Sequence, residues 1–356
     1  MGAWTWVVPA SAMFLLVAAG AAGDIGRPFL LLCGIGLGAA VMAAVHHAEV
    51  IAHRVGEPFG TLVLALAVTV IEASLILSMM VAGGAEMAVL PRDTIYAAVM
   101  IICNGVMGLC LLIGGLAHRE QSFRVEGAGA GMAALIVMSG LTLALPAFTT
   151  SAAGGKYTTS QLWFLAAASA TLWAIFVFIQ TIRHRDYFLP ATDADNPDEH
   201  APAPSLQQAW ISFGLLLVSL VGVVGLAKVL SPTIEQLVEG AGAPRAVVGI
   251  SIAILVLLPE TVAAVRAASA NRLQTSMNLA VGSALASIGL TIPVVVIAGS
   301  AFNLPLVLGL APTELTLLAL TFVVSAVTLS SGRTHMMQGA VHLVIFAAFL
   351  FLSIVP

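Results

Sequence analysis

Eleven long apolar segments dominate this sequence and limit what it can fold into. Each is about 18 to 24 residues long, the length that a helix needs to cross the hydrocarbon core of a bilayer. They lie near residues 6–23, 29–47, 61–83, 94–116, 129–148, 162–182, 209–230, 246–267, 277–300, 312–330 and 337–355. None shows the apolar/polar alternation of a strand, which leaves helices as the structure that satisfies backbone amides in lipid. The sequence therefore predicts an all-α integral membrane protein with about 11 transmembrane helices.

Composition agrees with a membrane location and excludes several functions. The 356 residues are 60% hydrophobic and only 8% charged, whereas about a quarter of a typical globular chain is charged. A net charge of −4 gives no basic face for a nucleic-acid partner. The phosphate-binding motif GxxxxGK[ST] and the zinc-protease motif HExxH are both absent, which argues against ATP as energy source and against a metalloprotease. Cys33, Cys103 and Cys110 lie in apolar stretches without metal spacing, so we expect buried small side chains and no resident cofactor.

The first apolar segment has two interpretations. The stretch MGAWTWVVPASAMFLLVAAGAAGD has the apolar core and small-residue end of a signal peptide. Its first Lys or Arg is Arg27, so the positive beginning of a signal peptide is missing. We therefore predict an N-terminal transmembrane helix within residues 1–28, with a cleaved signal peptide as the alternative.

One long polar segment, residues 183–208, divides the rest of the chain. It separates five apolar segments in 29–182 from five in 209–356. A unit with an odd number of spans, used twice, places its copies in opposite orientations, as in the inverted repeats of secondary transporters. We predict one extra N-terminal helix plus two inverted five-helix repeats.

The distribution of Lys and Arg predicts the orientation in the membrane. Eight lie on the side of the N-terminus and five on the other, and cytoplasmic loops carry the excess. The N-terminus and the linker 183–208 are therefore expected in the cytoplasm, and the C-terminus in the periplasm. The linker is acidic and is expected to be a solvated loop, or alternatively a sensor of cytoplasmic cations.

Two glutamates lie deep within apolar segments. Glu72 is the only charged residue between Glu57 and Glu86, and Glu260 is the only one between Arg245 and Arg266. A carboxylate at such depth costs about 2.5 kcal/mol or more, so it usually faces a bundle interior and has a function. Each could bind a cation or take up a proton, and that competition predicts exchange of a cation for H⁺. The alternative is a neutral, hydrogen-bonded pin between helices.

Several neutral oxygens are expected near the two carboxylates. Thr69 lies three residues before Glu72 on nearly the same helix face, and Ser74 follows closely. Hard cations use such oxygens to complete their coordination. On the helices that follow the two glutamates, the candidate ligands are Asn104, Ser283 and Ser287. Small polar residues in membrane helices also serve simply to allow close packing, and that alternative stays open.

Histidines supply further candidates for proton transfer. A set spaced three or four residues apart, hence on one helical face, could form a cation vestibule or proton relay: His46, Glu49, His53 and Glu57. A solvated ionic helix end is the alternative. His342, within the last apolar segment, is a candidate proton carrier or a hydrogen-bonded packing residue.

Three stretches resemble a known family. HHAEVIAHRVGEPFGTLVLALAVTVIEASLI, VLLPETVAAVRAASANRLQTSMNLAVGSALASIGLTIPVV and SSGRTHMMQGAVHLVIFAAFLF are similar to the bacterial ChaA-type calcium/proton antiporters of the cation/calcium exchanger superfamily. The resemblance implies a one-plus-five-plus-five helix fold with a cytoplasmic linker, and cation binding by Glu72 and Glu260. The wider superfamily has Asn three residues before each Glu, where this chain has Thr69 and Leu257. That difference leaves Na⁺ or K⁺ open beside Ca²⁺.

We therefore expect a proton-coupled antiporter of a bacterial inner membrane that exchanges Ca²⁺, or Na⁺ or K⁺, for H⁺. A cation channel lined by the same carboxylates is a different class of function that the sequence also allows. A membrane sensor that uses the linker is a third. The sequence gives no indication of oligomeric state.

Overall fold

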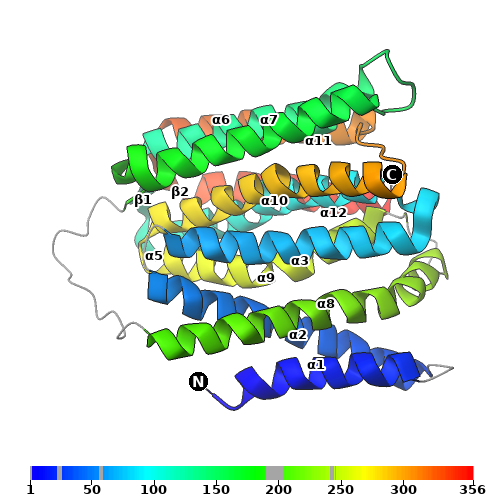
Figure 1. Cartoon of the computed structure of the whole chain (residues 1–356). Helices are drawn as coiled ribbons and strands as arrows, with labels where there is room; N and C mark the ends of the chain where they lie inside the picture. Colours follow the sequence, from blue (N-terminus) through cyan, green and yellow to red (C-terminus); the bar gives the residue numbers. More distant parts are fainter. Residues whose placement is uncertain are drawn as a thin grey trace. The chain divides into compact units, whose positions relative to one another are not determined.

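The chain is almost entirely helical (Figure 1). The computed structural model describes residues 2–21, 26–55, 59–189, 204–240, 244 and 246–355. The α-helices are α1 (Trp4–Ala21), α2 (Arg27–Val55), α3 (Phe59–Gly83), α4 (Leu90–Met100), α5 (Met107–His118), α6 (Val125–Ser139), α7 (Thr159–Phe178), α8 (Leu206–Gly240), α9 (Ala246–Ser269), α10 (Leu273–Phe302), α11 (Pro312–Ser330) and α12 (Met336–Ile354). Three π-helical segments continue α-helices: η2 (Ile101–Val106), η3 (Gly140–Ala144) and η5 (Ile179–Arg183). Short 3₁₀ turns are η1 (Gly84–Met87), η4 (Leu145–Ala147) and η6 (Arg185–Phe188).

The described helices fit a multi-pass membrane protein. Ten helical segments in these ranges are long and apolar enough to cross a bilayer, and a bent pair within α9 brings the number to 11. That pair, Val247–Leu258 and Glu260–Ser269, is bent by 52°. The predicted all-α membrane architecture is confirmed. Of the polar linker predicted at 183–208, residues 190–203 lie outside the described ranges.

One small β-structure was not predicted. Strands β1 (Glu120–Ser122) and β2 (Arg333–His335) pair antiparallel, with Gln121 opposite Thr334. β1 lies in the loop between α5 and α6, and β2 lies in the loop between α11 and α12. Their pairing therefore joins these two loops. Three-residue strands are too short to produce a recognisable alternation in the sequence.

The chain forms two compact units, each built from both halves of the sequence. Unit 1 comprises Met1–Met87 and Glu199–Val248, and unit 2 comprises Ala88–Asp198 and Gly249–Pro356. Unit 1 therefore holds α1, α2, α3 and α8, and unit 2 holds the remaining helices. These units differ from the predicted repeats, 29–182 and 209–356, which remain a prediction from the sequence.

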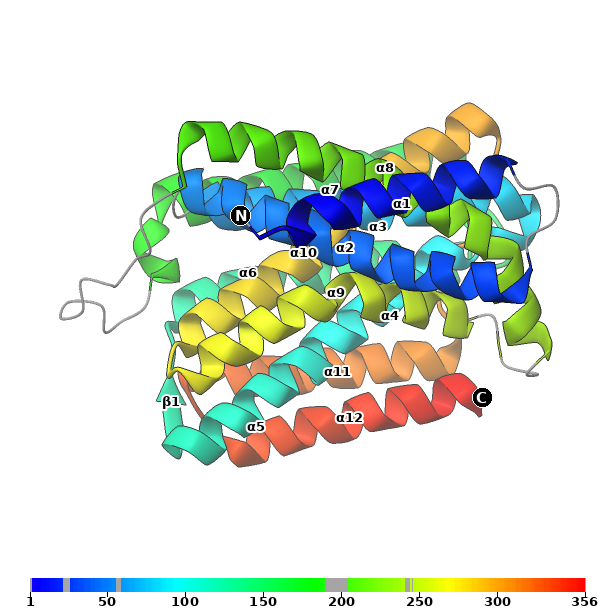
Figure 2. The same ribbon diagram turned by 90° about the horizontal axis from the view of Figure 1, so that it is seen from below.

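Unit 1 is held together by α2, which packs along α8 and contacts α1 and α3 (Figure 2). A buried histidine adds a specific link between helices. Pro9 lies inside α1 and has no N–H, so the carbonyl of Thr5, one turn earlier, lacks its helical donor. His47 Nε2 lies 2.9 Å from that carbonyl oxygen, and His47 Nδ1 lies 3.3 Å from Ser212 Oγ on α8. His47 thus joins α1, α2 and α8.

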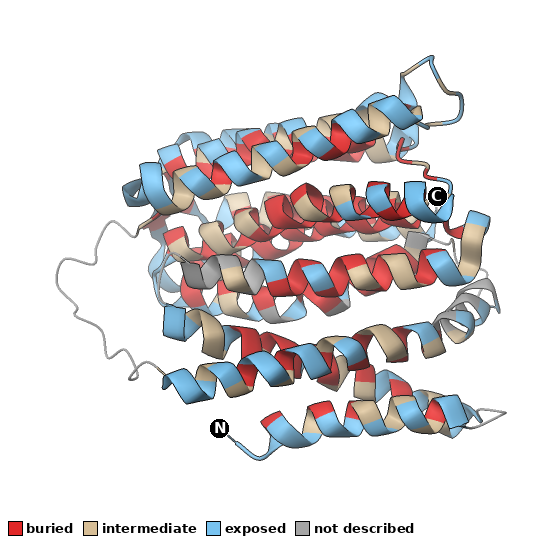
Figure 3. Cartoon of the chain, in the orientation of Figure 1, coloured by how far each residue is buried: buried red, intermediate tan, exposed pale blue. Residues whose placement is uncertain are grey.

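Unit 2 is organised around α10 and the continuous α4–η2–α5 span. Buried residues concentrate on these helices, whereas much of α7 is exposed and apolar (Figure 3). Phe164 on α7 is 68% exposed, as expected for a side chain that faces lipid. α12 lies beside α5 and α11 (Figure 2). Glycines allow the α5–α12 approach, since a Cβ on Gly339 would lie 2.4 Å from the backbone nitrogen of Leu112.

Candidate ion-binding sites

Glu72 occupies the middle of α3 in unit 1. It is 2% exposed, and Thr69, one turn earlier on the same face, is 4% exposed. Both belong to the buried side of the helix, while Val70 between them is exposed. Ser74 is half-buried. The predicted pair of a carboxylate and a hydroxyl therefore shares one buried helix face.

Glu260 lies in unit 2, directly after the bend of α9, and is 8% exposed. Ser283 Oγ on α10 donates a hydrogen bond to Glu260 Oε2 over 2.5 Å. A hydroxyl that donates to a carboxyl oxygen stabilises the ionised form of that carboxyl more than the protonated form. Ser283, predicted as a cation ligand near the carboxylates, thus lies in direct contact with Glu260.

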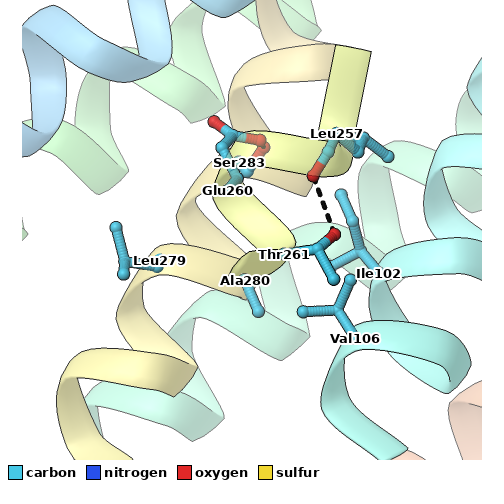
Figure 4. A pocket seen from close by; sticks show the side chains of 8 residues that line it. All are labelled: Ile102, Val106, Leu257, Glu260, Thr261, Leu279, Ala280 and Ser283. Atoms are coloured by element: carbon cyan, nitrogen blue, oxygen red, sulfur yellow. Dashed lines mark hydrogen bonds between the residues drawn. The ribbon is translucent and has the colours of Figure 1, made fainter. Parts of the chain in front are cut away.

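A small pocket adjoins Glu260 (Figure 4). Its volume is about 10 Å³, close to the least that holds one water molecule. The walls are mostly apolar, and the polar groups come from α9 and α10; the lining residues are Ile102, Val106, Leu257, Glu260, Thr261, Leu279, Ala280 and Ser283. In such surroundings a carboxylate must be neutralised, either by a proton or by a cation.

Thr261 is a pocket residue that the sequence analysis missed. Its hydroxyl donates to the carbonyl oxygen of Leu257 over 2.7 Å, as drawn in Figure 4. The oxygen of that hydroxyl retains acceptor capacity toward the pocket. Its position in the sequence, directly after Glu260, could have identified Thr261 as a candidate. Ser287, one turn beyond Ser283 on α10, is also buried, at 3% exposure.

The structure brings two other predicted residues together in unit 2. Asn104, in η2, and His342, in α12, are both fully buried, and His342 Nδ1 lies 3.3 Å from Asn104 Oδ1. Asn104 Nδ2 donates to Thr321 Oγ1 on α11 over 2.9 Å. Asn104 does not line the Glu260 pocket as described. Its two amide ends are engaged with α11 and α12.

The predicted vestibule lies at the end of α2. Glu49 and His53 are exposed, and His46 is half-buried with its ring 4.9 Å from that of Trp4. Glu57 lies outside the described residues, as do the acidic residues of the linker. His47, which the spacing rule did not select, is the buried member of this region.

Within the described ranges, no group of three or more His, Cys, Asp and Glu side chains is placed to hold a metal ion. The side-chain oxygens that line the Glu260 pocket are its carboxylate and the hydroxyls of Thr261 and Ser283. Oxygen donors of this mixed kind suit Ca²⁺ and the alkali cations rather than zinc.

A family model described as sodium/calcium exchanger protein matches residues 28–182 and 211–355. The chain belongs to this exchanger family. The membership confirms the resemblance seen in the sequence. Among relatives, the y4hA protein of Sinorhizobium fredii is 45% identical over 355 residues, which cover 99% of this chain and 96% of y4hA. The sodium-potassium/proton antiporter ChaA of Escherichia coli is 34% identical over 322 residues, covering 90% and 87% of the two chains.

Solved structures share the exchanger fold. The structure of the H⁺/Ca²⁺ exchanger CAX has a TM-score of 0.73 at 14% identity, covering 98% of this chain and 87% of that one. The structure of native YfkE has a TM-score of 0.72 at 19% identity, covering 99% and 100%. At these identities the comparison establishes the fold alone. It is the fold of an all-α membrane exchanger.

Proposed function

We propose that this exchanger is a secondary active antiporter of a bacterial inner membrane that moves a cation in one direction and H⁺ in the other. The observation that carries the proposal is the buried carboxylate of Glu260, held by Ser283 beside a pocket of about 10 Å³. Family membership supports transport rather than catalysis, and ChaA of Escherichia coli is itself named a cation/proton antiporter.

Competition at the carboxylates drives the exchange in this proposal. A proton and a cation each neutralise a buried carboxylate, and the site holds one or the other. Glu72 on α3 and Glu260 on α9 are the proposed binding groups, with Thr69, Ser74, Ser283 and Ser287 as oxygen donors on the same or following helices. Alternating access of these groups to the two membrane sides then couples the two fluxes.

The first proposed substrate is Ca²⁺, with Na⁺ and K⁺ as the alternative. Carboxylate and hydroxyl oxygens suit all three ions. Thr69 and Leu257 stand where the wider superfamily carries Asn, so this chain offers fewer amide oxygens for Ca²⁺. The Escherichia coli relative is named for sodium and potassium, which supports the alternative.

We further propose that the N-terminus and the linker 183–208 face the cytoplasm and the C-terminus the periplasm. The excess of Lys and Arg on that side supports this orientation. Glu49 and His53, exposed at the end of α2, would then gather cations on the cytoplasmic side.

The test is cation-driven proton flux in proteoliposomes that contain the purified chain, recorded with a pH-sensitive dye. We expect Glu72→Gln and Glu260→Gln each to abolish exchange, because the amide keeps the shape and loses the charge. Glu120→Gln is the matched control, since Glu120 is an exposed residue that pairs with Arg333 over 3.7 Å. Normal exchange by either buried variant contradicts the proposal. Single-channel currents in place of saturable, ΔpH-coupled flux would identify a channel instead.

A further inference from the structure

A second buried polar cluster lies in unit 2, apart from the residues that line the Glu260 pocket. It consists of Asn104 on η2, His342 on α12, and Thr321 and Thr328 on α11. The four residues are at most 3% exposed. His342 Nε2 lies 3.1 Å from Thr328 Oγ1, and the Asn104 amide joins His342 to Thr321. The proposed exchange reaction leaves this cluster without a role.

The hydrogen bonds have one consistent direction. Thr321 Oγ1 donates to its own helix at the Leu317 carbonyl, over 2.8 Å, so it accepts from Asn104 Nδ2. That places Asn104 Oδ1 toward the imidazole, where, with the backbone of Cys103 nearby, it accepts from His342 Nδ1–H. The unprotonated His342 Nε2 then accepts from the Thr328 hydroxyl. His342 therefore acts as a donor on one side and an acceptor on the other.

The cluster is anchored to an unusual backbone. Asn104 lies in one of the three π-helical segments, and π-helices are rare and are frequently found at functional sites. Ile102 and Val106, two residues to either side of Asn104, line the Glu260 pocket. Successive residues in helices of this kind are turned by about 80 to 100° about the helix axis. Asn104 is two residues from both Ile102 and Val106, so it lies on the face of η2 opposite to them. One face of η2 forms the pocket wall, and the other is bonded to α11 and α12.

Close packing places the imidazole accurately. A Cβ on Gly108, just after η2, would lie 3.1 Å from His342 Cβ, and one on Gly105 would lie 3.3 Å from the ring of Phe346. Small residues of this kind allow membrane helices to approach until their backbones meet. α12 is therefore seated directly against the η2–α5 backbone, and His342 has little freedom to move away from Asn104.

We propose that His342 and Asn104 are positioning residues that hold η2 in its π-helical form and thereby set the cation preference of the Glu260 pocket. Without the imidazole, the Asn104 carbonyl group loses its donor in a place that water does not reach. Relaxation of η2 toward an α-helix rotates Ile102 relative to Val106 and reshapes the pocket wall. This inference rests on the proposed cation/proton exchange.

The test compares the apparent KM values for Ca²⁺ and Na⁺ in proteoliposomes of the parent and of variants. His342→Leu removes the hydrogen bonds of the ring, and we expect the ratio of the two KM values to shift by about fivefold or more. His342→Gln offers an N–H to Asn104 and an oxygen to Thr328 but cannot serve as a proton carrier. We expect it to keep the parental ratio within about twofold.

A second variant covers the case in which His342→Leu does not fold. Thr328→Val preserves the shape of the side chain and removes one hydrogen bond to the ring, and we expect a smaller shift of the KM ratio in the same direction. The matched control is Thr316→Val on the same helix, whose exposed hydroxyl donates to the Pro312 carbonyl.

The outcomes separate this inference from the proposed function. If the parent shows no cation-driven proton flux, the proposed function fails and this inference fails with it. If the parent exchanges but His342→Leu, or Thr328→Val in its place, keeps the parental KM ratio, only the positioning role is overturned. If His342→Gln shifts the KM ratio as far as His342→Leu does, the imidazole itself is needed as a proton carrier. That result also overturns the positioning role of His342.

Discussion

Replacing Ser283 by alanine examines the chemistry of the Glu260 pocket most directly. The variant removes a hydroxyl that donates to Glu260 Oε2 over 2.5 Å, beside a carboxylate that is 8% exposed. A hydrogen bond to a charged group contributes about 1.5–3 kcal/mol and one between neutral groups about 0.5–1.5 kcal/mol. Ser283 therefore favours the ionised carboxylate over the protonated one by about 1–1.5 kcal/mol.

This free-energy difference changes the apparent affinity for the cation. The cation binds the ionised carboxylate, and a proton competes with it for that group. At about 1.4 kcal/mol per tenfold, Ser283→Ala should raise the apparent KM for the cation about 5- to 12-fold. The increase is expected at the acidic end of the assay range, where the proton occupies the site. It should shrink toward alkaline pH, where the carboxylate is ionised in both proteins.

The assay is a cation titration of dye-reported proton flux at several pH values. Ser269→Ala is the matched control, since the Ser269 hydroxyl is exposed and donates to the Val265 carbonyl of its own helix. An unchanged KM at acidic pH refutes the reasoning. An equal increase at every pH also refutes it, because the loss of the Ser283 oxygen as a cation ligand would then account for the whole change, with no contribution from the ionisation of Glu260.

Two predictions concern stability. His47→Leu should lower the free energy of unfolding by about 2–3 kcal/mol, since it leaves the Thr5 carbonyl without a donor; thermal unfolding measures the loss, and His53→Leu at the exposed end of α2 is the control. A midpoint equal to that of the parent contradicts the link between Pro9 and His47. Gly339→Ala should lower the free energy of unfolding by about 1–3 kcal/mol, because the added Cβ clashes with the Leu112 backbone. Gly129→Ala should lower it much less, because there is open space at its Cβ. Equal losses in the two glycine variants refute the close approach of α5 and α12.

Bilayer physics made the helices predictable. The thickness of the hydrocarbon core fixes the length of an apolar span, so eleven segments were recognisable without any knowledge of their packing. The cost of a buried charge likewise pointed to Glu72 and Glu260, and both are buried. Ser283 could be selected as a candidate ligand because it lies on the helix after Glu260, but its direct hydrogen bond to Glu260 is seen only in the structure.

The remaining features depend on backbone details that residue patterns do not carry. The π-helical turn η2 changes the phase of the helix, so a spacing rule based on an α-helix cannot say which way Asn104 faces. His47 was missed because the rule grouped His46, Glu49 and His53 on one face and assigned no partner to the neighbouring face. Its partner, the Thr5 carbonyl, is available only because of Pro9 on another helix.

The pairing of β1 with β2 has a consequence for biosynthesis. Residues 120–122 are made long before residues 333–335, and the Asn104–His342 contact joins residues 238 positions apart. Unit 1 has all its helices once α8 has been synthesised, whereas unit 2 waits for α12, the last helix to leave the ribosome. Contacts so distant in sequence form slowly, and domains assemble in the order of their synthesis. A chain stopped before α12 would therefore have every helix of unit 1, but it would leave the α5 glycine face of unit 2 uncovered.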